Sequence, residues 1–147
     1  MIYKLLNEPL DIDDVLGVWL KHMGQYTKII GYSATGAIFL MSPNTMEYLV
    51  FYPSKPGNNS KAYGKFDTLK AFEETILKDK IFHEYCLYPI NPEDLIVLEK
   101  TLGILNEEQI FYPKLDPALG GSIELEAFDK GDIWIRTEIL GQNRGIE

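Results

Sequence analysis

The sequence contains few of the residues that build disulfides or metal centres. Its 147 residues include one cysteine, Cys86, and two histidines, His22 and His83. A single cysteine excludes an internal disulfide, and only His83 and Cys86 lie close enough in sequence to suggest part of a zinc site. No apolar run approaches the roughly 20 residues of a membrane-spanning helix. We therefore expect no metal, no cofactor and no membrane partner.

We also expect no secretory signal, because Glu8 and Pro9 interrupt the N-terminal segment before an apolar region of sufficient length can form. Cytoplasmic residence is the expectation that follows. Hydrophobic residues make up 46% of the chain and charged residues 24%, which is the balance of a globular protein. A chain of this length can bury a full core, so we predict one domain over residues 1–147.

The charge is unevenly distributed along the chain, whose net charge is −8. Residues 1–80 contain nine acidic and nine basic residues, whereas residues 81–147 contain 13 acidic and five basic ones. The whole acidic excess therefore lies in the second segment. Such a surface repels nucleic acid and attracts basic partners, although acidic surfaces also serve solubility alone. We expect no nucleic-acid partner.

The N-terminal half predicts one helix followed by strands. Apolar residues recur at helical spacing over residues 12–23 and Gly24 can end that helix, so residues 1–27 are predicted to be a helical N-terminal extension. Short β-prone runs at 28–33 and 37–41 flank Gly36 and predict a hairpin. Two further strands are predicted at residues 46–52 and 61–66.

The C-terminal half predicts mainly helices. Asp67 can cap a helix that buries Leu69 and Phe72, and a short helical segment is expected over residues 82–88. The run Asn91-Pro92-Glu93-Asp94 is a strong helix start. Residues 133–140 suit either a strand or a helix. The predicted fold class is α+β: an antiparallel meander of about four strands with helices packed on one face.

Several segments resemble a known family of bacterial proteins. They are Gly31-Tyr32-Ser33-Ala34-Thr35-Gly36-Ala37-Ile38-Phe39-Leu40, Pro117-Ala118-Leu119-Gly120-Gly121-Ser122, Glu124-Leu125-Glu126 and Ile139-Leu140-Gly141-Gln142. The family is the C-terminal domain of immunity proteins against DNase effectors of the type VI secretion system, a domain that often follows a GAD-like domain. The resemblance covers residues 28–142 and implies an immunity-type domain there, with a helix at 133–140.

No catalytic motif accompanies this resemblance. The run Gly31-Tyr32-Ser33-Ala34-Thr35-Gly36 is neither a GxSxG elbow nor a phosphate-binding loop. His83 and Cys86 lie three residues apart, but a base at that spacing on one helix seldom has the geometry that nucleophilic catalysis needs. We therefore expect a binding protein rather than an enzyme, with a small enzyme centred on His83 and Cys86 as the least favoured hypothesis.

The resemblance implies that the partner is a cognate toxin, a secreted nuclease effector neutralised by occlusion of its active or DNA-binding surface. Acidic side chains would meet the basic nuclease, and aromatic anchors would add affinity. The predicted contacts are all acidic or aromatic residues of the second segment: Glu107, Glu108, Tyr112, Asp116, Glu124, Glu126, Asp129, Asp132 and Trp134. The alternative is a regulatory module that binds a small molecule or peptide in an apolar pocket against the sheet.

Overall fold

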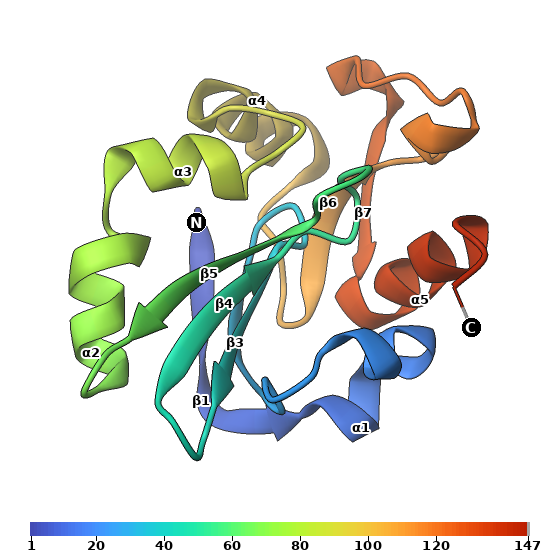
Figure 1. Ribbon diagram of the computed structural model, residues 1–147. Coiled ribbons are helices and arrows are strands. Elements are labelled where there is room, and N and C mark those ends of the chain that lie inside the picture. Colours follow the sequence, from blue (N-terminus) through green and yellow to red (C-terminus); the bar gives the residue numbers. More distant parts are fainter. Residues whose placement is uncertain (147) are drawn as a thin grey trace.

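A five-stranded antiparallel sheet forms the centre of the protein, whose computed structural model describes residues 1–146 (Figure 1). The strands lie side by side in the order in which they occur along the chain, which makes the sheet a simple meander. They are β1 (Tyr3–Asp11), β2 (Lys28–Ser33), β3 (Ile38–Ser42), β4 (Glu47–Phe51) and β5 (Ser60–Lys65). The α+β class and the antiparallel meander are thus confirmed, with five strands in place of about four.

The hairpin between β2 and β3 forms where the sequence predicts it. Gly36 has a φ of +95°, which a residue with a side chain rarely adopts, and the Ser33 N–H donates to the Ala37 carbonyl at 2.8 Å. The backbone N–H of Phe111 donates to the Ala34 carbonyl in the same turn at 2.8 Å. The turn therefore joins the meander to the second half of the chain.

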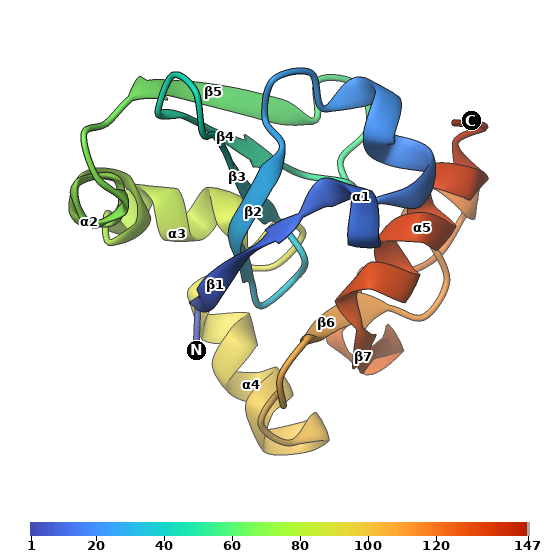
Figure 2. The ribbon, with the colours of Figure 1, turned by 90° about the horizontal axis from the view of Figure 1, so that it is seen from below.

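Successive helical segments cover one face of the sheet (Figure 2). The Asn91 side chain and the Asp94 carboxylate cap the longest of them reciprocally, as the sequence predicts. Its inner residues Leu95 and Leu98 are buried. The segments on this face are α2 (Leu69–Phe72), the π-helical turn η2 (Glu73–Leu77), α3 (Lys80–Cys86) and α4 (Pro92–Leu102).

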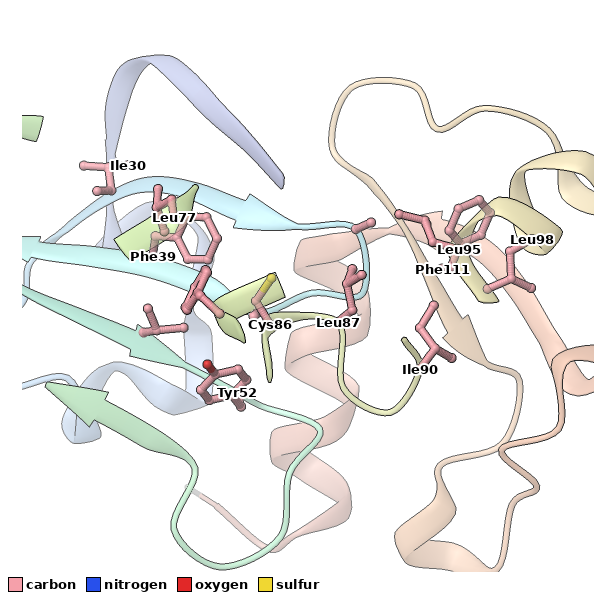
Figure 3. Packing of buried hydrophobic residues seen from close by; sticks show 14 of the residues in the cluster. Ile30, Phe39, Tyr52, Leu77, Cys86, Leu87, Ile90, Leu95, Leu98 and Phe111 are labelled. Carbon is pink, nitrogen blue, oxygen red and sulfur yellow. The ribbon is translucent and has the colours of Figure 1, made fainter. Parts of the chain in front are cut away.

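Aromatic and aliphatic side chains fill the space between these helices and the sheet (Figure 3). The rings of Tyr48 and Phe72 stack with centroids 4.4 Å apart, and neither residue is exposed. Phe39 lies against both Tyr3 and Phe82. Burial of such rings is the main stabilising contribution of this face.

The opposite face of the sheet is covered as well, which differs from the prediction of helices on one face. Trp19 and Ile133 pack there against Ile38 and Phe51 of the sheet. The covering segments come from the two ends of the chain: α1 (Ile12–Val15), the 3₁₀ helix η1 (Gly17–His22) and α5 (Ile133–Asn143). None of the helices within residues 1–146 is long and apolar enough to cross a membrane.

A two-stranded antiparallel sheet links the meander to α5. Its ladder runs from the pair of Gln109 with Asp132 to the pair of Pro113 with Phe128. The connection between its strands contains two short 3₁₀ helices. These elements are β6 (Gln109–Pro113), η3 (Pro117–Leu119), η4 (Leu125–Ala127) and β7 (Phe128–Asp132).

The N-terminal segment differs most from the sequence-based prediction. Residues Tyr3–Asp11 form an edge strand paired with β2, so the prediction of a helical extension over 1–27 is wrong there. The predicted helix over 12–23 is broken at Gly17, where φ is +46°. Residues 133–143 are helical, as the family resemblance implies.

Candidate functional site

A shallow hollow between α1 and α5, here termed the α1–α5 hollow, combines apolar side chains with acidic ones. It has a volume of about 590 Å³ and opens to the protein surface. Ile135 in its lining is 64% exposed and Ile139 is 40% exposed, so two large aliphatic side chains of the hollow are accessible to a partner. The lining residues are Asp13, Asp14, Val15, Gly17, Asp132, Trp134, Ile135, Glu138 and Ile139.

Asp132 caps the N-terminus of α5 and fixes where this helix begins. The outward-facing apolar residues of α5 then lie at the hollow. The Asp132 carboxylate accepts hydrogen bonds from the N–H groups of Trp134 at 2.8 Å and Ile135 at 2.9 Å. Ile133 is fully buried and fixes the inner side of the helix. Because residues three and four apart share a helical face, Ile135 and Ile139 are left together on the outer side.

Polar contacts join α5 to η1, the 3₁₀ helix that follows α1. The Val18 N–H, left free by the break at Gly17, donates to the Glu138 carboxylate at 3.0 Å. The indole N–H of Trp19 donates to the Thr137 carbonyl at 2.8 Å. These bonds hold residues about 120 positions apart in sequence at a fixed spacing. The hollow is therefore a feature of the tertiary structure rather than of a local motif.

The chemistry of the α1–α5 hollow suits a basic amphipathic partner. Asp13, Asp14, Asp132 and Glu138 supply four acidic side chains, and no basic residue belongs to the lining. Protein interfaces combine an apolar centre with a polar rim, and opposite charges accelerate association. The lining of the hollow contains both kinds of group, exposed Ile135 and Ile139 and four acidic side chains.

The structure places some of the predicted contact residues at this hollow. Asp132 and Trp134 line it directly. Glu108 adjoins it, because its N–H donates to the Tyr32 hydroxyl at 2.9 Å and its carbonyl accepts from the Ile133 N–H at 2.8 Å. The Trp134 ring packs edge-on against the Tyr32 ring. These three predicted residues form one neighbourhood.

The other exposed predicted residues lie elsewhere. Glu107 forms an ion pair with Lys4 of the edge strand at 3.2 Å. Glu124 and Glu126 lie in the β6–β7 connection, whereas Asp132 lies at the opposite end of β7. The five-residue ladder places those ends about 13 Å apart. Asp129 is exposed as the second residue of β7, so the predicted acids are not all gathered at the α1–α5 hollow.

Asp116 and Tyr112 have structural contacts that the sequence did not reveal. Asp116 is 1% exposed and pairs with Arg144 at 3.0 Å, so its prediction as a partner contact is corrected to an internal ion pair. Burial would raise the pKa of its carboxyl, but hydrogen bonds from Ala118 and Asn143 and the charge of Arg144 lower that pKa overall. Tyr112 is half-buried with its ring beneath the Arg136 guanidinium.

Sequence reasoning missed seven of the nine lining residues of the hollow: Asp13, Asp14, Val15, Gly17, Ile135, Glu138 and Ile139. Asp13 and Asp14 follow a helix cap and have the composition of an ordinary first turn. The spacing of Ile135 and Ile139 was a usable signal for one helical face. It did not identify which face was exposed, because that depends on the contact with η1.

A second concave surface, the tyrosine groove, lies beside the edge strand β5. It has a volume of about 450 Å³. The Lys61 ammonium lies 5.0 Å from the centre of the Tyr63 ring, a cation–π arrangement, and burial raises the pKa of Tyr63. The lining residues are Tyr52, Lys55, Asn58, Ser60, Lys61, Tyr63, Glu84, Tyr85 and Tyr88.

The geometry of His83 and Cys86 does not form a nucleophile–base pair. The His83 Nε2 lies 2.7 Å from the Leu77 carbonyl, and the Cys86 thiol donates to the His83 backbone carbonyl at 3.7 Å. Cys86 is fully buried among core residues (Figure 3), and this burial raises the pKa of its thiol to about 12. A reactive cysteine requires the thiolate, so this arrangement disfavours catalysis at Cys86.

Within residues 1–146, no three His, Cys, Asp or Glu side chains gather in a way that could hold a metal ion. No protein-family model matches the sequence, and no curated protein sequence matches it. The structure is similar to the crystal structure of Atu4351 from Agrobacterium tumefaciens, with a TM-score of 0.61 and 19% sequence identity. The similarity covers 96% of this chain and 66% of that one, and at this identity it shows a shared fold alone.

Proposed function

We propose that this protein is a bacterial immunity protein that binds and neutralises a cognate toxin inside the producing cell. The toxin is a basic nuclease, of the kind that type VI secretion systems deliver, and inhibition occurs by covering its active or DNA-binding surface. The observation that carries the proposal is the α1–α5 hollow, whose lining combines exposed Ile135 and Ile139 with four acidic side chains. The sequence resemblance over residues 28–142 supplies the class of toxin.

In this mechanism, charge and apolar contact have separate roles. The carboxylates of Asp13, Asp14 and Asp132 draw the basic surface of the nuclease toward the hollow and accelerate association. Trp134 and Ile135 then contact an apolar side chain of the toxin and slow dissociation. Inhibition requires no chemistry, since occupation of the phosphate-binding surface excludes DNA.

The test uses a nuclease encoded beside this gene. DNA cleavage by the purified nuclease is measured with increasing amounts of this protein, and stoichiometric protection is the expected result. Double charge reversal, Asp13→Lys with Asp14→Lys, should slow association at least tenfold at low salt and less at high salt. An unchanged association rate at every ionic strength would contradict the electrostatic role of the hollow.

A matched control changes the net charge equally at another location. Glu84→Lys with Glu93→Lys places the same two reversals on exposed positions of α3 and α4, over the other face of the sheet. This control should retain most of the association rate. Equal slowing by both double variants would show that overall charge, and not the α1–α5 hollow, directs binding. Failure of the unmodified protein to protect DNA would reject the immunity proposal itself.

The tyrosine groove supports a second candidate function, a regulatory module for a small molecule or peptide. Lys55 and Lys61 lie over the rings of Tyr52 and Tyr63, and Tyr85 is 62% exposed at the same groove. Tyrosine rings with adjacent cations suit a planar or anionic ligand. A Tyr63→Ala variant that protects DNA normally but loses a ligand found by metabolite screening would separate the two functions.

A further inference from the structure

Arg136 is a buried cation without a partner among residues 1–146. It lies in the second turn of α5 and is only 8% exposed. No carboxylate of the described residues lies within salt-bridge distance, and its guanidinium forms no hydrogen bond to them. Its Nε is completely enclosed and unbonded. A buried charge normally has a compensating partner, because its desolvation is otherwise uncompensated.

Asp116, the acidic residue whose charge acts on Arg136, is committed to another arginine. Asp116 accepts hydrogen bonds from Arg144 at 3.0 Å, Asn143 at 3.3 Å and the Ala118 N–H at 3.0 Å. The Asp116 carboxylate thus pairs with Arg144, and the charge of Arg136 is left without a paired carboxylate among residues 1–146. Burial lowers the pKa of Arg136 and the charge of Asp116 opposes this, but an arginine remains protonated at neutral pH.

Arg136 lines a small pocket between α5, β6, the β2–β3 turn and the segments that follow β4, α3 and β6. The pocket has a volume of about 30 Å³. A water molecule needs about 10–15 Å³ of such space, so the pocket admits about two atoms of oxygen size. One side of the guanidinium lies against the Tyr112 ring, 4.8 Å from its centre. Most of the remaining wall is apolar and includes Pro53, Pro113 and Leu140.

We propose that this pocket binds a single carboxylate group, which pairs with the Arg136 guanidinium. Two coplanar carboxylate oxygens match the planar arginine fork and the available volume, whereas sulfate and phosphate carry four oxygens. The apolar wall suits the hydrocarbon part of a small carboxylic acid. The carboxylate belongs either to a free small acid or to the terminus of a peptide, and the proposal is independent of toxin binding.

The experiment follows the Arg136 Nε–H signal by nuclear magnetic resonance while acetate replaces chloride at constant ionic strength. A saturable shift of this signal is expected for acetate, and sulfate should leave it unchanged. Arg136→Met should weaken acetate binding at least tenfold, as judged from backbone signals of Tyr112 and Thr137. The control Lys114→Met removes an exposed charge from the same end of β6 and should bind acetate as the unmodified protein does.

Stability provides a second readout. Acetate should raise the melting temperature of the unmodified protein but not that of Arg136→Met. In chloride, the melting temperature of Arg136→Met should equal or exceed that of the unmodified protein. If Arg136→Met does not fold, Arg136→Lys keeps the charge, loses the planar fork and should still bind at least tenfold more weakly. A non-saturable shift, or acetate binding retained in both variants, would overturn the proposal.

Two further ligands distinguish the sources of the carboxylate. N-acetylglycine represents a peptide terminus, and its amide is the uncharged control. Binding of N-acetylglycine at least tenfold tighter than acetate would assign the pocket to a peptide terminus, whereas equal or weaker binding would assign it to a free small acid. Equal responses to N-acetylglycine and its amide would overturn the proposal, because the carboxylate charge would then be irrelevant.

Discussion

The two faces of the five-stranded sheet are covered in different ways. On one face, α2, α3 and α4 follow one another in sequence and enclose a core of rings such as Tyr48 and Phe72. On the other face, α1, η1 and α5 come from opposite ends of the chain and meet through the bonds of Val18 with Glu138 and Trp19 with Thr137. The α1–α5 hollow lies at this second meeting point.

Under the proposed function, the first face mainly determines stability and the second face also provides the surface for recognition. The first face has the larger buried core and contributes most of the hydrophobic burial. The second combines a smaller core with an exposed Ile135 and acidic groups. Substitutions on the first face should therefore change the free energy of unfolding, while outward substitutions on the second should change binding.

The largest effect is expected in the first core. Phe72→Ala removes a ring that stacks on Tyr48 and also contacts Tyr63 and Phe66. The free energy of unfolding should fall by about 3–5 kcal/mol, because both burial and packing are lost. Urea denaturation measures it. Ile81→Ala, at a 66% exposed position of α3, is the control and should change stability by less than about 0.5 kcal/mol.

The second-largest effect on stability is expected for the ion pair between Asp116 and Arg144. Asp116→Ala leaves Arg144 without its buried carboxylate and should lower the free energy of unfolding by about 3 kcal/mol. Glu74→Ala breaks the exposed ion pair with Lys78 and should produce no measurable change in stability. Equal effects of the two substitutions would contradict a specific role for burial at Asp116.

The pH dependence of stability tests the contribution of Asp116 in a second way. The pKa of Asp116 is lower in the folded protein than its ordinary value of 3.8, so the folded state favours the charged carboxylate. Its stabilising contribution is complete above about pH 4 and is lost as the pH falls through the folded-state pKa. The stability difference between the unmodified protein and Asp116→Ala should therefore shrink below pH 4, as measured by denaturation at successive pH values.

A smaller effect is expected where α5 contacts η1. A side-chain carbon at Gly141 would collide with Val18 and the Trp19 indole, so this glycine permits the close approach of the two helices. Gly141→Ala should reduce the free energy of unfolding by about 2 kcal/mol. Trp19 fluorescence should change as well. Gln142→Ala, at the neighbouring exposed position, should leave both quantities near those of the unmodified protein.

The sequence predicted the parts of the fold that depend on neighbouring residues. The Gly36 turn, the Asn91 cap and the following helix each have a local cause, and all are confirmed. The edge strand β1 was missed because its identity depends on pairing with β2, and Tyr3 faces Ser33 across a large sequence separation. The break at Gly17 was missed for a similar reason, since its Val18 N–H finds an acceptor in distant Glu138.

The candidate site was predictable only in part. Asp132 and Trp134 were identified from charge and aromatic character, and they lie at the hollow. Asp116 has the same charge but an internal partner, Arg144, located 28 residues further along the chain. Local sequence cannot distinguish an acidic residue that faces solvent from one that pairs within the fold.

The smallest effect on stability should accompany the largest effect on binding. Ile135→Asp changes a 64% exposed residue and should alter the free energy of unfolding by less than about 0.5 kcal/mol. In the DNA-protection assay it should weaken nuclease binding at least tenfold, because an apolar contact at the centre of the interface is lost. Ile96→Asp makes the same change at a 55% exposed position of α4 and should leave protection intact. Full protection by Ile135→Asp would move the binding surface away from the α1–α5 hollow, and the exposed loop carrying Glu124 and Glu126 would be the next surface to test.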